Sequence, residues 1–274
     1  MIIFAYSVKF KQNIPNFLTC CNLLCGCLAL VQAFEGNLVW AAYWVGIAAV
    51  LDFLDGFAAR LLNVVSPIGK DLDSLADMVT FGLVPGVMMY KLIGFSFSKH
   101  IFGVFMNVFF NEKELGMEQY LVFTAFLGFL ITIFSAIRLA KFNNDSRQSD
   151  SFIGLPTPAN AILICSIPLI ADLKDVRDIT TFPLFGLDSL IINPYFLLTL
   201  TVLLSFLLIA PIRLFALKFK SFGWEGNQIR YVFLALSLGL LIGLQYVGVT
   251  LTIFLYVLMS IANNLFKKKE ISSP

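Results

Sequence analysis

The sequence predicts an all-α integral membrane protein, a bundle of about eight transmembrane helices. Hydrophobic residues make up 59% of the 274 residues and charged residues only 13%, and the mean hydropathy is +0.87. No water-soluble fold could bury so large an apolar share. Because one crossing takes about 20 apolar residues, the chain can cross several times but has no room for a separate soluble domain.

Apolar runs of about spanning length recur along the whole chain. In hydrocarbon, a spanning segment must satisfy its own backbone hydrogen bonds, so we expect these runs to be helices. The runs are 15–34, 38–60, 74–95, 119–141, 156–171, 195–217, 230–246 and 249–266. The further apolar stretch 101–110 is too short to cross, and we expect it to lie along the membrane interface.

The basic residues predict the orientation of the bundle. With eight crossings both termini lie on one side of the membrane, and 14 of the 19 Lys and Arg residues fall on that side. Basic loops are retained in the cytoplasm. We therefore expect both termini to be cytoplasmic, in a multi-pass protein of the cytoplasmic membrane.

The remaining composition argues against two kinds of site. The formal net charge is only +2 and the basic residues are scattered among loops, so no nucleic-acid partner is expected. Four of the five cysteines lie in the first apolar run and the chain has one histidine. Neither a disulfide framework nor a zinc site is expected from that pattern.

Four aspartates near the second and third runs carry the strongest chemical signal. A charged side chain inside a membrane costs about 3 kcal/mol on insertion scales, so these carboxylates need a reason. Two are three residues apart and two are four apart, which places each pair on one helix face. They are Asp52, Asp55, Asp73 and Asp77.

Turn-forming residues between the two pairs predict an antiparallel helix hairpin that brings all four carboxylates to the cytoplasmic end. The predicted loop contains Asn63, Ser66, Pro67 and Gly69. Four close carboxylates repel one another unless cations bind them. Oxygen-only ligands favour Mg²⁺ or Mn²⁺, and two ions could bridge a diphosphate.

Small and basic residues beside the carboxylates suit a nucleotide ligand. Gly56 and Ala59 would let it approach the helix backbone closely. Arg60 could pair with a phosphate.

Together these residues resemble the signature of the CDP-alcohol phosphatidyltransferase family, D-x2-D-G-x2-A-R-x8-G-x3-D-x3-D. All eight fixed identities are present at the fixed spacing, in the predicted helix–loop–helix context. They are Asp52, Asp55, Gly56, Ala59, Arg60, Gly69, Asp73 and Asp77.

The resemblance implies a six-helix catalytic core, usually dimeric, that uses a CDP-linked donor and releases CMP. Two C-terminal spans are added here, so we expect a core over 1–217 and an additional hairpin over 218–274. By the same resemblance, Asp52, Asp55 and Asp73 hold metal and Asp77 acts as general base. Since all four carboxylates are expected to meet, we count Asp77 among the candidate metal ligands as well. The implied CDP-binding residues are Asp52, Gly56, Ala59, Arg60, Gly69 and Asp73.

Three further stretches resemble one branch of the family, the phosphatidylserine synthases of bacteria and archaea. They lie at residues 14–23, 73–85 and 138–159. The resemblance implies CDP-diacylglycerol as donor, L-serine as acceptor and membrane lipids as surroundings. Candidate substrate contacts in these stretches are Asn16, Thr19, Thr80, Arg138 and Lys141.

The sequence is compatible with other interpretations. Arg138 and Lys141 could be topology anchors at an inner helix end. Asn16, Thr19 and Asn22 could cap or pack the first span. Inositol phosphate and glycerol phosphate are alternative acceptors. An ion or proton transporter is a more distant alternative. Transport predicts carboxylates near the membrane midplane and an inverted repeat, whereas here the carboxylates are predicted at one end of the spans and the sequence shows no repeat.

Overall fold

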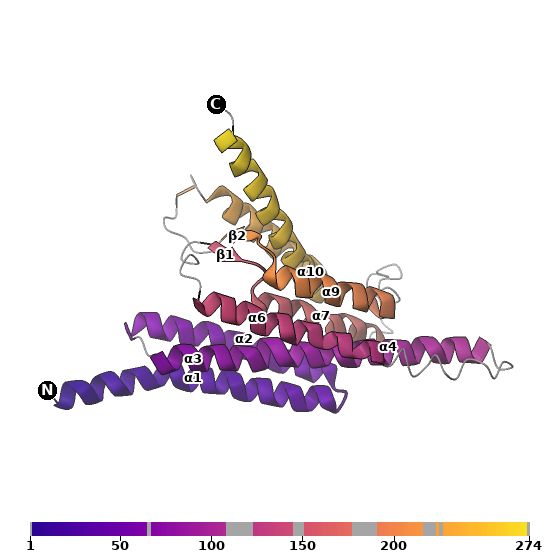
Figure 1. Cartoon of the computed structure of the whole chain (residues 1–274), viewed down its shortest axis with the longest axis horizontal. Coiled ribbons are helices and arrows are strands. Elements are labelled where there is room, and N and C mark those ends of the chain that lie inside the picture. The colour runs from indigo at the N-terminus through magenta and orange to yellow at the C-terminus, as the bar shows by residue number, and fades with distance from the viewer. Residues whose placement is uncertain are drawn as a thin grey trace.

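A computed structural model of the chain shows a bundle of long helices with one short pair of strands (Figure 1). It describes residues 2–64, 67–107, 123–144, 151–176, 191–215, 223–224 and 227–272. Within these residues, five helical segments are long and apolar enough to cross a membrane, and two shorter apolar helices accompany them. The predicted all-α, polytopic membrane fold is confirmed.

The first half of the chain forms one layer of the bundle. Helices α1 (Ile2–Phe34) and α2 (Leu38–Leu61) are antiparallel and joined by a turn at Gly36, whose φ of 88° favours glycine. They pack beside α3 (Pro67–Asp77), the π-helix η1 (Met78–Leu83) and α4 (Val84–Asn107). These last three elements follow one another without a break, as the helical dihedrals of Asp77 and Val84 show.

The prediction that residues 101–110 lie along the interface is wrong over 101–107, because those residues continue α4. No proline interrupts the helix there. Figure 1 shows the end of α4 extending beyond the neighbouring helices.

The second layer lies over the first (Figure 1). It contains the 3₁₀ turn η3 (Ala125–Phe129), α6 (Leu130–Asn144), α7 (Thr157–Val176) and α9 (Pro194–Ile209). Large side chains fill the core between the layers, including Phe81, Met88, Ile93, Ile131 and Ile164.

The predicted span 195–217 is wrong at its C-terminal end. Helix α9 stops at Ile209, and Ala210 is extended, with φ −60° and ψ 140°. Pro211 follows, and a proline disfavours the helical conformation in the residue before it. The chain then enters strand β2 (Arg213–Phe215).

Strand β2 pairs antiparallel with β1 (Ser151–Ile153), which joins the end of α6 to the start of α7. Gly154 follows β1 with a φ of 78°, and a Cβ there would collide with the backbone oxygen of Leu208. Its N–H donates to Ile212 O at 3.0 Å. The glycine thus allows the α6–α7 connection to lie against the end of α9.

The last element, α10 (Gln228–Ser272), consists of two helices that double back at Gln245, where φ is 48° and ψ is −117°. A Cβ on Gly248 would touch Leu240 O, although eight residues of straight helix would separate them by about 12 Å. The turn agrees with the two predicted runs 230–246 and 249–266. Tyr256 Oη then donates to Phe215 O at 2.8 Å, joining α10 to β2.

Candidate active site

The hairpin of α2 and α3 places the aspartates at one end of the bundle. After α2, Asn63 adopts a left-handed φ of 50° and reverses the chain. Helix α3 then begins at Pro67, a residue whose fixed φ suits the first helical position. The prediction that Gly69 lies in the loop is therefore wrong, because Gly69 is in the first turn of α3.

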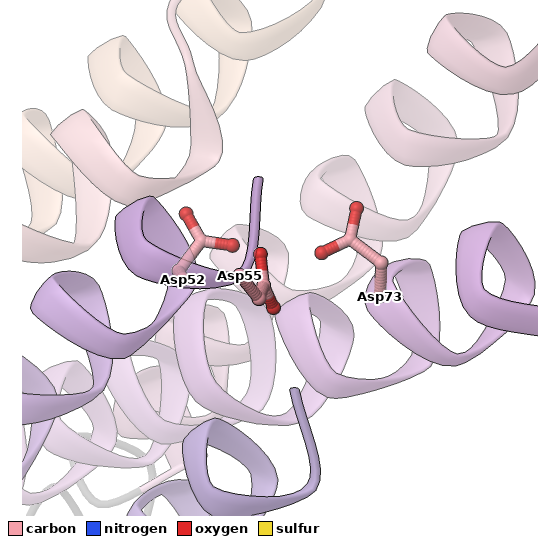
Figure 2. A group of neighbouring side chains, drawn as sticks. All are labelled: Asp52, Asp55 and Asp73. Atoms are coloured by element: carbon pink, nitrogen blue, oxygen red, sulfur yellow. The ribbon is translucent and has the colours of Figure 1, made fainter. Parts of the chain in front are cut away.

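Three carboxylates converge between the two helices. One oxygen from each of Asp52, Asp55 and Asp73 lies within 4.8 Å of the others. Figure 2 shows Asp55 between Asp52 and Asp73, whose carboxyl groups turn toward it. Asp55 is buried and the other two are half-buried, so the group lies at the edge of the protein interior.

The fourth aspartate lies one turn beyond Asp73 on the same face of α3. Asp77 is outside the group of three, yet its charge interacts with Asp52, Asp55 and Asp73. One of its carboxyl oxygens is fully buried and has no hydrogen-bond partner among the described residues. The π-helix η1 begins immediately after it, and π-helical turns occur frequently at functional sites.

A threonine from α1 fixes the orientation of Asp55. Thr19 Oγ1 lies 2.6 Å from Asp55 Oδ2 and 3.1 Å from the backbone oxygen of Pro15. Thr19 is 4% exposed, so this hydrogen bond forms away from bulk water. A buried hydrogen bond to a charged group is stronger than an ordinary one.

A pocket of about 690 Å³ opens beside the carboxylates. A Cβ on Gly56 would meet no atom within 4 Å, so the space beside that glycine is open. Arg60 Nε donates to Gly56 O at 2.9 Å, which holds the base of the guanidinium along α2. The pocket is lined by Pro15, Asn16, Thr19, Asp55, Gly56, Ala59, Arg60, Asn63, Val64, Gly69, Lys70 and Asp73.

Four of these lining residues were not among the predicted site residues: Pro15, Asn63, Val64 and Lys70. Lys70 could have been predicted from the sequence, because it directly follows Gly69 of the signature. Its Nζ donates to Asn143 O at 3.2 Å, and Asn143 Nδ2 donates to Ser74 Oγ at 2.8 Å. These bonds attach α3 to the end of α6.

The predicted substrate contacts separate into different places. Asn16 and Thr19 line the pocket, whereas Thr80 is fully buried and donates to Asn22 O at 3.4 Å. Arg138 is buried, donates to Thr157 Oγ1 at 3.4 Å and interacts with the charge of Asp77. Lys141 is exposed on α6 and does not line the pocket.

The donor set suits a divalent cation. The converging atoms are all carboxylate oxygens, the ligands that hard cations prefer. Among the described residues, no Lys or Arg forms an ion pair with Asp52, Asp55 or Asp73. Like charges this close therefore call for a bound cation.

Comparison with known proteins supplies the family. The family described as CDP-alcohol phosphatidyltransferase matches residues 12–187, more than half of the chain. The chain belongs to the CDP-alcohol phosphatidyltransferase family. It is therefore an enzyme, and enzymes of this family use divalent metals, in agreement with the acidic cluster.

Relatives with assigned names point in the same direction. A Helicobacter pylori (strain ATCC 700392 / 26695) protein is 30% identical over 243 residues, which cover 88% of this chain and 87% of that protein. A Bacillus subtilis (strain 168) protein is 32% identical over 53% of this chain and 69% of its own length. Both are named CDP-diacylglycerol–serine O-phosphatidyltransferase.

An archaeal relative carries a related name. The archaetidylserine synthase of Methanothermobacter thermautotrophicus is 27% identical over 57% of this chain and 58% of its own length. The similarity to the Helicobacter protein extends over more of the chain than the family match does.

Proposed function

We propose that this CDP-alcohol phosphatidyltransferase transfers the phosphatidyl group of CDP-diacylglycerol to L-serine, giving phosphatidylserine and CMP. The observation that carries the proposal is the convergence of Asp52, Asp55 and Asp73 beside an open pocket. The buried Arg138, whose charge interacts with Asp77, adds a cation for the acceptor. The names of the relatives support serine as the acceptor.

The pocket suits the CDP part of the donor. The open space beside Gly56 allows a nucleotide to lie against the backbone of α2, and Ala59 adds little bulk on the same helix. Arg60 is exposed at the rim, where it would bind a phosphate group. Gly69, Asp52 and Asp73 complete the proposed donor contacts.

Asp52, Asp55, Asp73 and Asp77 would hold the metal, which we propose to be two Mg²⁺ or Mn²⁺ ions. Bound there, the ions would neutralise the diphosphate and stabilise the charge that develops as CMP leaves. Thr19 would keep Asp55 oriented, since its hydroxyl donates to one carboxylate oxygen and leaves the other available.

The proposed reaction is a direct displacement at phosphorus. The serine hydroxyl oxygen forms a bond to the phosphorus that carries diacylglycerol, and the bond from that phosphorus to the CMP oxygen breaks. Asp77 accepts the hydroxyl proton, and CMP departs with the electron pair of the broken bond. An unpartnered, buried carboxyl oxygen on Asp77 supports this role.

The charges near the site favour an amino acid over a phosphorylated acceptor. Arg138 is the buried cation among the described residues, and it suits one carboxylate. Inositol phosphate and glycerol phosphate would each bring a phosphate that calls for more basic residues. Asn16, Thr80 and Lys141 remain proposed substrate contacts, Lys141 from the exposed face of α6.

The proposal also covers the wider organisation of the protein. We place the active site and both termini at the cytoplasmic face, from the distribution of Lys and Arg. We propose a homodimer, with residues 1–217 as catalytic core and 218–274 as an added hairpin. The end of the family match at residue 187 supports an addition at the C-terminus.

The test is an assay of purified protein with CDP-diacylglycerol, Mn²⁺ or Mg²⁺ and a panel of labelled alcohols. CMP and lipid product should form with L-serine and disappear in Asp77→Asn. Product formed only from inositol phosphate, glycerol phosphate or another alcohol would refute the assignment of serine.

A further inference from the structure

Buried polar atoms without a hydrogen-bond partner cluster around η1, next to Asp77. Among the described residues, nine fully buried side-chain nitrogen and oxygen atoms have no hydrogen-bond partner. Seven of them belong to Asn22, Asp77, Ser135, Arg138 and Asn160. For both asparagines the oxygen and the nitrogen of the amide are unpartnered, and both residues are 0% exposed.

These residues come from four elements that meet at one place. Thr80 of η1 donates to the backbone oxygen of Asn22, which joins η1 to α1. A Cβ on Gly82 of η1 would lie 3.2 Å from Cβ of Ser135, so α6 packs directly on the other side. The group therefore surrounds η1, immediately after Asp77.

Arg138 and Asn160 come from α6 and α7. Arg138 lies one turn after Ser135 on α6, and its guanidinium donates to Thr157 of α7. Asn160 lies one turn after Thr157, on the same side of α7. Asn160 therefore lies one helical turn from the residue that binds the guanidinium.

Two unpartnered amides in a protein interior need an explanation. Each buried polar group without a partner destabilises the fold by about 1–3 kcal/mol, whereas an apolar residue of similar shape would not. A bound polar molecule would supply the missing hydrogen bonds. Sites built for a ligand commonly sacrifice stability in this way.

We propose that Asn160 and Asn22 bind the two charged groups of the acceptor amino acid, and so determine its specificity. Asn160, beside Arg138, binds the carboxylate through its amide N–H groups. Asn22, one helical turn after Thr19 on α1, accepts a hydrogen bond from the ammonium group. The hydroxyl would then lie toward Asp77, between the two asparagines.

This arrangement explains how a zwitterion is selected. One arginine and two neutral amides complement a carboxylate and an ammonium, but they cannot neutralise a phosphate. The inference rests on the proposed function, since it assigns contacts to the same acceptor. It adds two residues that neither the signature nor the pocket contains.

The test replaces each asparagine by leucine, a side chain of similar size without polar atoms. In Asn160→Leu and Asn22→Leu, the Tm should stay unchanged or rise, because an unpartnered amide is removed. The KM for serine should rise about tenfold or more, the loss of one hydrogen bond to a charged group. The KM for CDP-diacylglycerol should change less than about twofold.

Asn227→Leu is the matched control. Asn227 is also buried, but its amide donates to Gly223 O at 2.9 Å and accepts from Arg230 at 2.7 Å. This substitution should lower the Tm and leave the KM for serine unchanged. If Asn160→Leu and Asn22→Leu behave like Asn227→Leu, the two asparagines are structural and the proposal fails.

Analogues separate the two roles. Ethanolamine lacks the carboxylate, so Asn160→Leu should reduce the ratio of kcat/KM for serine to kcat/KM for ethanolamine. 3-Hydroxypropionate lacks the ammonium group, so Asn22→Leu should reduce the corresponding ratio for serine over 3-hydroxypropionate. Unchanged preferences would overturn the assignments. If Asn160→Leu does not fold, Asn160→Ala gives the same comparison.

A binding measurement separates this inference from the proposed function. Serine without donor should raise the Tm of the wild-type protein but not that of Asn160→Leu. If the wild-type enzyme uses a different alcohol, the serine assay fails in the wild type and the proposed function is wrong. If the wild type uses serine and the variants keep its KM, only the present inference is wrong.

Discussion

The hydrogen bond from Thr19 to Asp55 should set the affinity of the enzyme for its metal. Thr19→Val keeps the shape of the side chain and removes the donor, leaving Asp55 Oδ2 without the contact seen at 2.6 Å. A hydrogen bond to a charged group contributes about 1.5–3 kcal/mol, and about 1.4 kcal/mol corresponds to a tenfold change in an equilibrium constant. Loss of a partner that orients a metal ligand typically costs 10–100-fold in metal affinity or activity.

The assay is CMP release as a function of free Mn²⁺ at saturating CDP-diacylglycerol and serine. In Thr19→Val, the Mn²⁺ concentration for half-maximal rate should rise about 10–100-fold. At saturating Mn²⁺ the rate should recover to within a few-fold of wild type, because Asp55 itself is still present. Thr19→Ser keeps the hydroxyl and should restore the Mn²⁺ dependence.

Thr201→Val is the matched control for this substitution. Thr201 is also buried, but its hydroxyl donates to Leu197 O of its own helix α9, at 2.7 Å. Its replacement should leave the Mn²⁺ dependence unchanged. A Thr19→Val enzyme with the Mn²⁺ dependence of the wild type would refute the role of Thr19 in orienting a metal ligand.

Three further substitutions test other parts of the structure. Gly56→Ala should leave the Tm unchanged or raise it slightly, because an added Cβ meets no atom within 4 Å and alanine favours the helix more than glycine does. The KM for CDP-diacylglycerol should nevertheless rise severalfold, because the added methyl group would occupy space beside the nucleotide. Gly46→Ala is equally open on the same helix and should change neither value, and an unaltered KM in Gly56→Ala would contradict close approach of the nucleotide. Gly128→Ala should destabilise the protein by about 1–3 kcal/mol, because its Cβ would lie 2.5 Å from the backbone nitrogen of Tyr90, and a wild-type Tm would contradict the packing of η3 on α4. Asn264→Ala removes a 2.7 Å hydrogen bond from α10 to Arg213 O of β2. Strand β2 pairs with β1, which leads into α7 at Thr157, the residue that binds Arg138, so the KM for serine should rise more than that for CDP-diacylglycerol. Equal changes in the two KM values would contradict this link.

Local rules predicted the acidic hairpin well. The spacing of Asp52 and Asp55 requires only that α2 be a helix, and the turn residues require only that α3 return beside it. The meeting of Asp73 with this pair follows from those two facts. The membrane fold was equally accessible, because hydropathy alone decides which segments can cross.

The details of the hairpin depended on competing local preferences. Glycine favours turns, which predicts Gly69 in the loop, but Pro67 favours the first position of a helix, so α3 begins two residues before Gly69. Similarly, the hydropathy around Pro211 is compatible with a continuous transmembrane helix. The proline nevertheless ends α9, and the residues that follow it form β2.

Contacts between distant segments could not be predicted from the sequence. The pairing of Phe152 with Leu214 joins residues far apart in the chain, and strands of this length give no periodic signal. The unpartnered state of Asn22 and Asn160 depends on which helices surround them. An asparagine in an apolar run is compatible with a cap, a packing residue or a ligand contact until its neighbours are known.

Mn²⁺ binding and turnover should be measured on the same preparations of wild type and Asp73→Asn. Wild-type protein should bind Mn²⁺, lose CMP release in excess chelator and regain it when Mn²⁺ is restored. Asp73→Asn should lose Mn²⁺ affinity and turnover together, because Asp73 is the ligand that α3 contributes to the group of three. Continued turnover of the wild type in excess chelator, or undiminished Mn²⁺ binding in Asp73→Asn, would contradict catalysis by metal held between α2 and α3.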